Sequence, residues 1–309
     1  NIELYGVYKS VLLSFCASRK KGTAIIMIAG TDIKNQSLFK KLESELQNEY
    51  LRYNNVSHPL PYEYRLQNGD NELFYFGTKH TCNPEEREFN RIKTIFKEFK
   101  PEVVFAEGVL QLHNAERAQI FQETIAKLNE YEAAQKGENI FTVHCGIKYQ
   151  CRIICPEPTI IDEAEYISKN GYSKEHIVLF YICKFLSRQY NAAPVEYVNK
   201  GLQYLKIHLK WDFDFSWTNF VSIHSQIIGK CEQYRHSDMY KRLTDPVPRQ
   251  ENKTLFQTNI PHISYLSNIY RDCCIILNIL DCFKDNNKLL VVFGATHAYV
   301  QKRLILNLL

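Results

Sequence analysis

The segment Leu73-Phe74-Tyr75-Phe76-Gly77-Thr78-Lys79-His80 joins a short apolar run to a polar ending, and the expected fold rests on it. The turn residues Asn68-Gly69-Asp70-Asn71 precede the run, and Gly77 ends it. A continuous apolar run between turn signals is typical of a strand that is buried on both faces. Such strands belong to parallel sheets whose two faces are covered by helices. The segment therefore predicts a buried strand that ends shortly before His80.

Three later segments share this apolar character: Val103-Val104-Phe105-Ala106, Arg152-Ile153-Ile154-Cys155 and Leu289-Leu290-Val291-Val292-Phe293. Between these segments, apolar residues recur at helical spacing. The first helix is expected to begin at Pro84, with Asn83 as its N-cap, and to end at Phe99. Further helices are expected over 118–128 and 263–277. The alternation predicts an α/β fold with a mainly parallel central sheet flanked by helices.

The chain divides by pattern into a lead-in and a main domain. From about residue 163 to 245 the spacing predicts helices only, which we interpret as an α-helical insertion. Residues 31–62 are polar and rich in turn residues, with one helix expected through Leu38, Leu42 and Leu46. We therefore expect an N-terminal lead-in over 1–62 and an α/β domain over 63–309 that contains the insertion.

The lead-in holds a basic and then apolar segment at residues 18–30. This order resembles a signal sequence with a short apolar part. A signal segment predicts a secreted or periplasmic protein; the alternative, a first strand of the fold, leaves a cytoplasmic protein. No run reaches the roughly 18 apolar residues that cross a bilayer, so no integral membrane span is expected.

Composition narrows the classes of partner. The 309 residues are 45% hydrophobic and 23% charged, as expected for a globular protein. Lys and Arg number 38 against 34 Asp and Glu, so the net charge is only +4. Such a small surplus argues against nucleic acid as a partner, because nucleic-acid-binding surfaces are strongly basic. The ten cysteines are scattered and several lie in apolar runs, which favours buried thiols over a disulfide framework.

Polar residues follow all four predicted strands. The first strand leads into Gly77-Thr78-Lys79-His80 and the last into Gly294-Ala295-Thr296-His297, so both end in the same Gly-x-x-His pattern. The second strand leads into Glu107, and the third leads into Glu157. Because ligands bind at the carboxyl ends of parallel strands, we expect these four side chains to meet in one crevice.

Imidazole and carboxylate groups in one crevice suit hydrolytic chemistry. A divalent metal ion takes such ligands and lowers the pKa of a bound water toward neutrality, and we expect His80, Glu107 and His297 as its ligands. A carboxylate left uncoordinated, Glu107 or Glu157, is the candidate general base. Glycine at the first position of each motif is expected to permit a tight turn after the strand.

At these residues the chain resembles the erythromycin-esterase-like and ChaN-like proteins, which are related to the TraB/PrgY and TIKI families. The resemblance is carried by the two Gly-x-x-His motifs, by Phe105-Ala106-Glu107-Gly108 and by the pairs Arg271-Asp272 and Gly137-Glu138, and it covers about residues 63–305. It implies a pocket built from the His and Glu residues, with Glu138 on the active-site side. Arg271 would fix a carboxylate or an oxyanion and Asp272 would orient Arg271. The alternative is a structural Arg-Asp pair on an amphipathic helix.

The resemblance implies a hydrolase of peptidase or esterase type that acts on a small-molecule or peptide substrate, with or without a metal ion. A Gly-x-Ser-x-Gly elbow and a Gly-rich phosphate loop are both missing from the sequence. One alternative is a protein that binds haem or another hydrophobic ligand, with walls built from Phe213, Phe215, Trp217 and Phe220. Another is a family member that retains the fold without catalysis.

Overall fold

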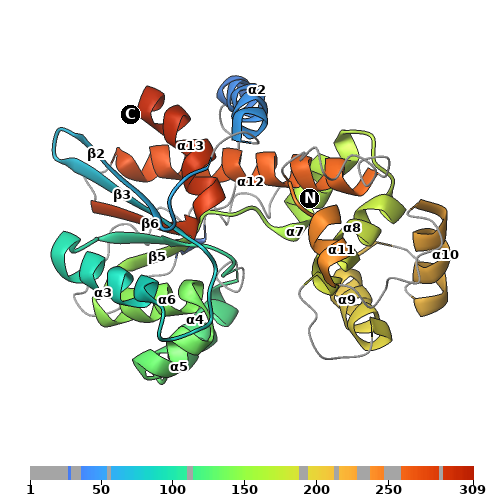
Figure 1. Cartoon of the computed structure of the whole chain (residues 1–309), viewed down its shortest axis with the longest axis horizontal. Coiled ribbons are helices and arrows are strands. Elements are labelled where there is room, and N and C mark those ends of the chain that lie inside the picture. Colours follow the sequence, from blue (N-terminus) through green and yellow to red (C-terminus); the bar gives the residue numbers. More distant parts are fainter. Residues whose placement is uncertain are drawn as a thin grey trace, which may run out of the picture.

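The computed structural model describes residues 27–28, 36–53, 57–109, 114–187, 194–211, 216–227, 237–246, 259–284 and 288–309. These residues form the expected α/β fold around one sheet (Figure 1). The strands are β1 (Met27–Ile28), β2 (Tyr62–Asn68), β3 (Asn71–Thr78), β4 (Val103–Ala106), β5 (Arg152–Cys155) and β6 (Lys288–Gly294). They lie in the order β1-β5-β4-β6-β3-β2. All neighbouring pairs are parallel except β2 and β3, so the mainly parallel sheet is confirmed.

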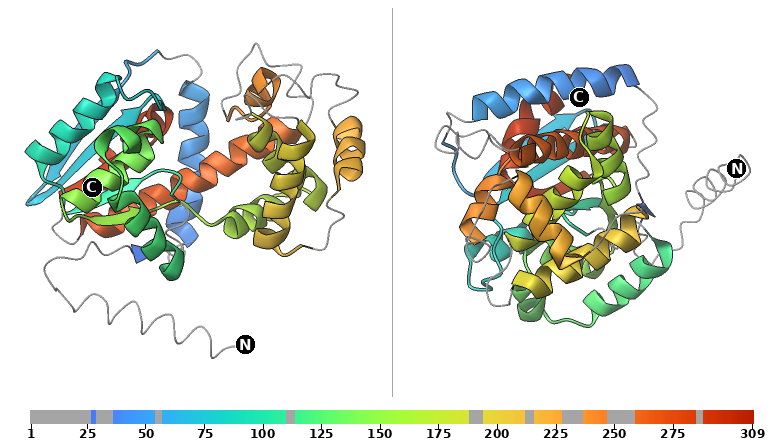
Figure 2. Two further views of the ribbon diagram at one scale, coloured as in Figure 1. Left: turned by 90° about the horizontal axis from the view of Figure 1, so that it is seen from below. Right: turned by 90° about the vertical axis from the view of Figure 1, so that its right-hand side faces the viewer.

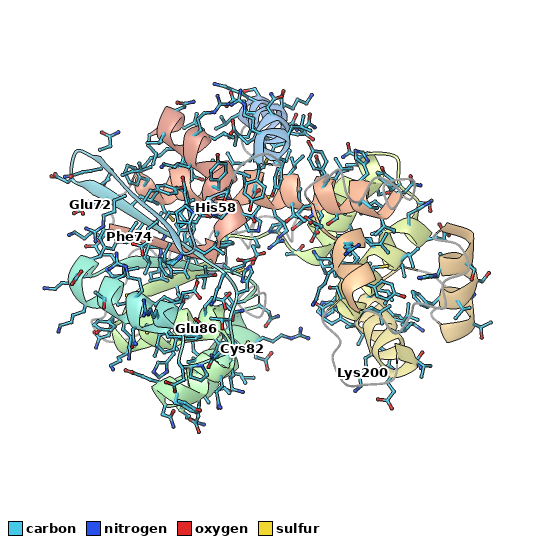
Figure 3. All side chains as sticks on the ribbon, in the orientation of Figure 1. His58, Glu72, Phe74, Cys82, Glu86 and Lys200 are labelled. Carbon is cyan, nitrogen blue, oxygen red and sulfur yellow. The ribbon has the colours of Figure 1, made fainter. Side chains whose placement is uncertain are left out.

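Helices cover both faces of the sheet. One layer consists of α3 (Arg87–Phe99), α4 (Ala115–Ala126), α5 (Glu130–Gln135) and α6 (Glu138–Lys148), and the other of α2 (Gln36–Tyr53), α12 (Asn259–Phe283) and α13 (Ala295–Leu308). Alternate residues of β3 reach opposite layers: Phe74 and Phe76 join the core under α3 and α6, whereas Leu73 and Tyr75 join the core under α12 and α13. Side chains fill the space between the sheet and both layers (Figure 3). The buried strands thus have the two covered faces that their apolar runs predict.

The helical insertion is confirmed as a second packed unit beside the sheet. It consists of α7 (Ile160–Lys169), α8 (Lys174–Leu186), α9 (Pro194–Leu209), α10 (Trp217–Ile227) and α11 (Ser237–Leu243), which share a core of their own. The first turns of α12 contribute Ile260 and Ile263 to that core, and the rest of α12 packs on the sheet. Figure 2 shows α12 running from the insertion across the sheet layer. A single helix therefore links the two cores.

The lead-in expected over 1–62 is wrong where the structure describes it, because α2 belongs to the main core. Phe39, Leu42, Leu46 and Tyr50 are all buried there. These residues recur every three or four positions and so lie on one side of the helix, while the other positions are mostly polar. The helix through Leu42 was expected, but its polar exposed face concealed that it packs against the domain.

The segment 18–30 lies mostly outside the described residues. Met27 and Ile28 form β1 and pair in parallel with Ile154 and Cys155 of β5. This pairing matches the alternative of a first strand for these two residues. No helix in the described ranges has both the length and the apolar character needed to span a membrane.

Several boundaries differ from the expected ones. α3 begins at Arg87 rather than Pro84, because Asn83 caps a preceding turn by accepting a hydrogen bond from the Glu85 N–H at 3.3 Å. β2, α6 and α13 were not expected. In β2 the signal is the alternation of Tyr62, Tyr64 and Leu66 before the turn at residues 69–70.

The cysteines follow the expectation of free thiols. All eight described cysteines are free, and all but Cys82 are buried. Burial raises the pKa of the Cys145 thiol and of the Cys151 thiol to about 12. Cys16 and Cys231 lie outside the described residues.

The contribution of α2 to the main core can be tested by truncating Leu46, which is fully buried. We expect Leu46→Ala to lower the free energy of unfolding by about 2–5 kcal/mol, because it removes core contacts and leaves a cavity. The matched control is Leu51→Ala on the same helix, where the residue is 55% exposed. It should change the free energy by no more than about 0.5 kcal/mol. Urea unfolding measures both; equal effects would contradict the packing of α2.

Candidate active site

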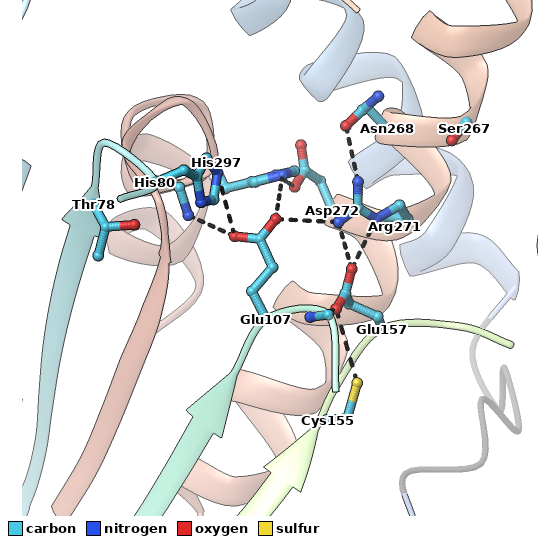
Figure 4. Close-up of polar contacts among 12 residues, drawn as sticks. Thr78, His80, Glu107, Cys155, Glu157, Ser267, Asn268, Arg271, Asp272 and His297 are labelled. Carbon is cyan, nitrogen blue, oxygen red and sulfur yellow. Dashed lines mark hydrogen bonds and ion pairs between the residues drawn. The ribbon is translucent and has the colours of Figure 1, made fainter. Parts of the chain in front are cut away.

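The carboxyl ends of four neighbouring strands carry the candidate site, and α12 passes beside them (Figure 4). The side chains of the site follow the ends of β3, β4, β5 and β6, and one comes from the first residue of α6. Hydrogen bonds and ion pairs connect all seven residues that the sequence predicted: His80, Glu107, Glu138, Glu157, Arg271, Asp272 and His297. They form one cluster.

Glu107 lies at the centre of this cluster. Its Oε2 accepts the Gly294 N–H at 2.7 Å and lies 3.9 Å from His80 Nε2. Its Oε1 lies 3.4 Å from Arg271 Nη2 and 3.8 Å from His297 Nε2. Burial opposes ionisation, but the charges of the two histidines and of the arginine outweigh it and lower the pKa of Glu107 from 4.5 to about 2. Glu107 therefore remains a carboxylate around neutral pH.

His80 is held by Glu138 in a carboxylate–imidazole pair. The His80 Nδ1 and Glu138 Oε1 atoms are 2.5 Å apart, and the other Glu138 oxygen accepts the Thr81 N–H at 3.1 Å. His80 has a backbone φ of 59°, in the left-handed region. Its side chain is 57% exposed. The hydrogen bond to Glu138 raises the pKa of His80 from 6.5 to about 9.

His297 belongs to a second pair of the same kind, formed with Asp272. The His297 Nδ1 and Asp272 Oδ1 atoms are 2.5 Å apart, and the side chains are 8% and 0% exposed. His297 stands in the first turn of α13, and Asp272 lies in the middle of α12. Burial opposes protonation of His297, but the Asp272 charge and hydrogen bond outweigh it and raise the pKa of the imidazole.

Arg271 and Asp272 act on different partners, which corrects the expectation that Asp272 orients Arg271. Arg271 instead contacts both carboxylates: it donates through Nε to Glu157 Oε1 at 3.0 Å and faces Glu107. Glu157 also accepts the Gly108 N–H. Adjacent residues on a helix point about 100° apart, so one side chain reaches the ends of β4 and β5 while the other reaches α13.

The two motif glycines provide space rather than a tight turn, which corrects another expectation. Neither has a positive φ. A Cβ at Gly294 would lie 2.5 Å from His80 Nε2, and a Cβ at Gly77 would lie 2.8 Å from Ala295 Cα and from Ala298 Cβ. A side chain is therefore excluded at Gly77 by the start of α13, whereas at Gly294 it would displace the His80 imidazole from its present position.

A pocket of about 470 Å³ opens beside the two imidazoles. His80 and His297 line it, whereas Glu107 and Glu138 are not among its lining residues. A further wall is formed by Tyr53 of α2, whose hydroxyl lies 2.9 Å from His58 Nε2 and 3.2 Å from Thr296 Oγ1. The pocket thus exposes both imidazoles to a ligand.

Several residues around this cluster were not predicted from the sequence. Asn268 accepts from Arg271 Nη1 at 3.3 Å, and Gln301 donates to Asp272 at 2.6 Å. Both could have been found, because Asn268 precedes Arg271 by three residues and Gln301 follows His297 by four, spacings that place side chains on one helix face. Tyr50 donates a hydrogen bond to Asp272 at 2.7 Å. It could not have been found by helical spacing, because it lies on a different helix from Asp272.

The walls proposed for a haem or hydrophobic ligand are mostly not described. Phe213, Phe215 and the Trp217 side chain lie outside the described residues. Phe220 is 3% exposed and packs in the core of the helical insertion. Binding of such a ligand stays a prediction.

The expected metal ligands have suitable donor atoms but do not form a metal centre as arranged. His80 Nε2 and His297 Nε2 each lie nearly 4 Å from a Glu107 oxygen. Among the side chains that the structure describes, no group of three or more His, Cys, Asp or Glu is placed to hold an ion. Arg271 and the Gly294 N–H already contact the Glu107 carboxylate.

Comparison of the chain with protein-family models, with curated proteins and with solved structures found no match. The family resemblance seen in the motifs therefore stays a prediction.

Replacing Glu138 by Gln should lower the pKa of His80 well below 9, because the hydrogen bond to Glu138 is the main cause of the raised value. In the wild type, the raised pKa stabilises the folded state fully below pH 6.5, and this contribution is lost as the pH rises through about 9. The variant should lose stability less over this range. Histidine NMR titration and urea unfolding at several pH values measure the two effects.

The control for this test is Glu86→Gln. Glu86 pairs with Lys79 at 2.9 Å on the surface beside the site, so its replacement should leave the His80 titration in place. A His80 pKa near 9 in Glu138→Gln would contradict the assigned cause.

Proposed function

We propose that this protein is a hydrolase of the ester or amide type, with His80 and His297 as its catalytic pair. The observation that carries the proposal is the matched arrangement of the two imidazoles. Each is bonded through Nδ1 to a buried carboxylate, each directs Nε2 toward Glu107, and both line the same pocket. Two such pairs facing one pocket suit acid–base chemistry.

The carboxylates determine which nitrogen of each ring is available. An ionised carboxylate only accepts hydrogen bonds, so Nδ1 carries the hydrogen in both histidines. In its neutral form, which predominates only above its pKa of about 9, His80 presents Nε2 as a proton acceptor to a water molecule in the pocket, so the activity should rise as the pH approaches 9. In its protonated form, His297 presents an Nε2–H that can donate to a leaving group. Their different exposure, 57% and 8%, favours His80 as the partner of water.

Glu107 and Glu157 have electrostatic roles in this proposal rather than the role of general base. Glu107 is held ionised by three cationic neighbours, so it is a weak proton acceptor at neutral pH. Its charge favours the protonated form of either imidazole as a proton moves. Glu157 is bonded to Arg271 and to the Gly108 N–H, and it fixes Arg271 beside Glu107.

The substrate class follows from the pocket and from the family resemblance. A volume of about 470 Å³ suits a small molecule or the end of a peptide. The esterase-like and TIKI-like relatives that the motifs resemble hydrolyse an ester and a peptide bond, respectively. We therefore propose a small-molecule or peptide substrate with a carbonyl group that water attacks.

Replacing either imidazole should abolish most of the activity. The probes are short-chain p-nitrophenyl esters and a mixture of fluorogenic peptides. We expect His80→Asn and His297→Asn to lower kcat/KM by roughly 10²–10⁴-fold, the usual contribution of a general acid or base. His176→Ala is the control, because His176 lies on α8 of the helical insertion and its hydrogen bonds go to Ser173 and Asn259 rather than to the cluster. Unchanged activity in both site variants, or a wild type inactive on every probe, would contradict the proposal.

A metal-dependent form of this hydrolase is the second candidate. One observation favours it: histidines that bind metals are usually bonded through their other nitrogen to a carboxylate, as His80 and His297 are. The ligands would be these two residues and Glu107, and the ion would supply a polarised water. The present arrangement does not form such a centre.

Metal analysis distinguishes the two forms. The metal-dependent form predicts about one equivalent of a divalent ion in the purified protein, loss of ester hydrolysis after EDTA treatment, and recovery with Zn²⁺, Mn²⁺ or Co²⁺. His297→Asn should then also lose the ion. Full activity after EDTA treatment, with no ion remaining, would contradict this candidate and leave the imidazole pair as the catalytic groups.

A further inference from the structure

The Asp272 carboxylate is fully buried and accepts three side-chain hydrogen bonds. Oδ1 accepts from His297 Nδ1 at 2.5 Å and from Gln301 Nε2 at 2.6 Å, while Oδ2 accepts from Tyr50 Oη at 2.7 Å. A buried carboxylate requires such donors, because it has lost its hydration. Tyr50 is the only one of the three that contacts the second oxygen among the hydrogen bonds seen in the described residues.

The donors are themselves fixed. Tyr50 is fully buried, and burial raises the pKa of its phenol, so the hydroxyl remains a donor. Gln301 accepts from Tyr75 Oη at 2.9 Å through its carbonyl oxygen, which turns the amide nitrogen toward Asp272. The donors come from α2 and α13, and the supporting tyrosine comes from β3. Elements distant in sequence thus hold one carboxylate.

Both oxygens must be held if Asp272 is to orient an imidazole. A carboxylate bonded only through Oδ1 can rotate about its side-chain bond, and the ring it holds can tilt with it. The Tyr50 hydroxyl prevents this rotation by occupying Oδ2. His297 Nε2 is thereby kept toward Glu107 and the pocket.

We propose that Tyr50 is a positioning residue of the candidate active site, which acts through Asp272 to orient the His297 imidazole. The alternative is that Tyr50 only fills the core, where its ring packs edge-on against Tyr265 at 5.9 Å between ring centroids. The catalytic consequence rests on the proposed hydrolase function. The orientation of His297 is a property of the folded protein and can be measured without a substrate.

The test is Tyr50→Phe in the full chain, which keeps the ring and removes only the hydroxyl. The matched control is Tyr265→Phe, because Tyr265 loses a hydroxyl from the same aromatic contact but donates to the Gln47 carbonyl oxygen instead of Asp272. Histidine-selective ¹⁵N labelling reports which nitrogen of each ring carries hydrogen, and His297→Asn assigns the His297 signals.

In the wild type we expect His297 to carry hydrogen on Nδ1, with the downfield proton signal of a short hydrogen bond. Tyr50→Phe should move this signal upfield or broaden it beyond detection, and Tyr265→Phe should leave it in place. In the ester assay, Tyr50→Phe should lower kcat by roughly 10-fold or more with little change in KM, as replacements of supporting groups do.

Two results would overturn the proposal. One is a His297 signal that is identical in wild type and Tyr50→Phe. The other is a wild type in which His297 carries hydrogen on Nε2 alone, and this result needs no variant to fold. A changed His297 signal in a protein that hydrolyses none of the probes would support the positioning role and contradict the hydrolase, so the two proposals fail separately.

Discussion

A carboxylate that is only 16% exposed and has three cationic neighbours is the constraint on which the rest of the candidate site depends. Glu107 cannot keep its charge inside the protein without Arg271, His80 and His297 around it. Those three side chains come from α12, from the end of β3 and from the start of α13. Their own charges are balanced by Glu157, Glu138 and Asp272. The site is thus a network of alternating charges, in which removal of one member leaves another without compensation.

The sequence was sufficient for the four strands β3 to β6 and for the seven charged or imidazole residues that form the cluster. Apolar runs mark β3, β4, β5 and β6, and the carboxyl ends of parallel strands lie at one edge of the sheet. The proximity of residues that are distant in sequence, such as His80 and His297, could therefore be predicted. Pairing within the site could not be predicted in this way. It depends on side-chain directions and on which oxygen lies nearest, as the separate partners of Arg271 and Asp272 show.

The largest difference from expectation concerns α2. Its mean composition is polar, and only the spacing of Leu42, Leu46 and Tyr50 indicates a buried face. This spacing predicts which residues of α2 are buried, but not that one of them has a further role. The buried face of α2 packs on α12 and α13, and it also brings the Tyr50 hydroxyl to Asp272. The glycines were misjudged for a related reason. Their conformation is ordinary, and the atoms that exclude a side chain come from residues far along the chain.

The position of β6 has a consequence for how the molecule is made. Of the described strands it is the last in sequence, yet it lies between β4 and β3 in the middle of the sheet. During synthesis the β2–β3 hairpin and the β4–β5 pair therefore have no common partner until residues 288–294 leave the ribosome. Until β6 is synthesised, the β2–β3 hairpin and the β4–β5 pair each expose an unpaired backbone edge. Such edges favour chaperone binding or misassembly. Because His297 follows β6 in the sequence, it is synthesised after all the other residues of the cluster. A nascent chain therefore cannot contain the complete charge network before β6 is available to pair with β3 and β4.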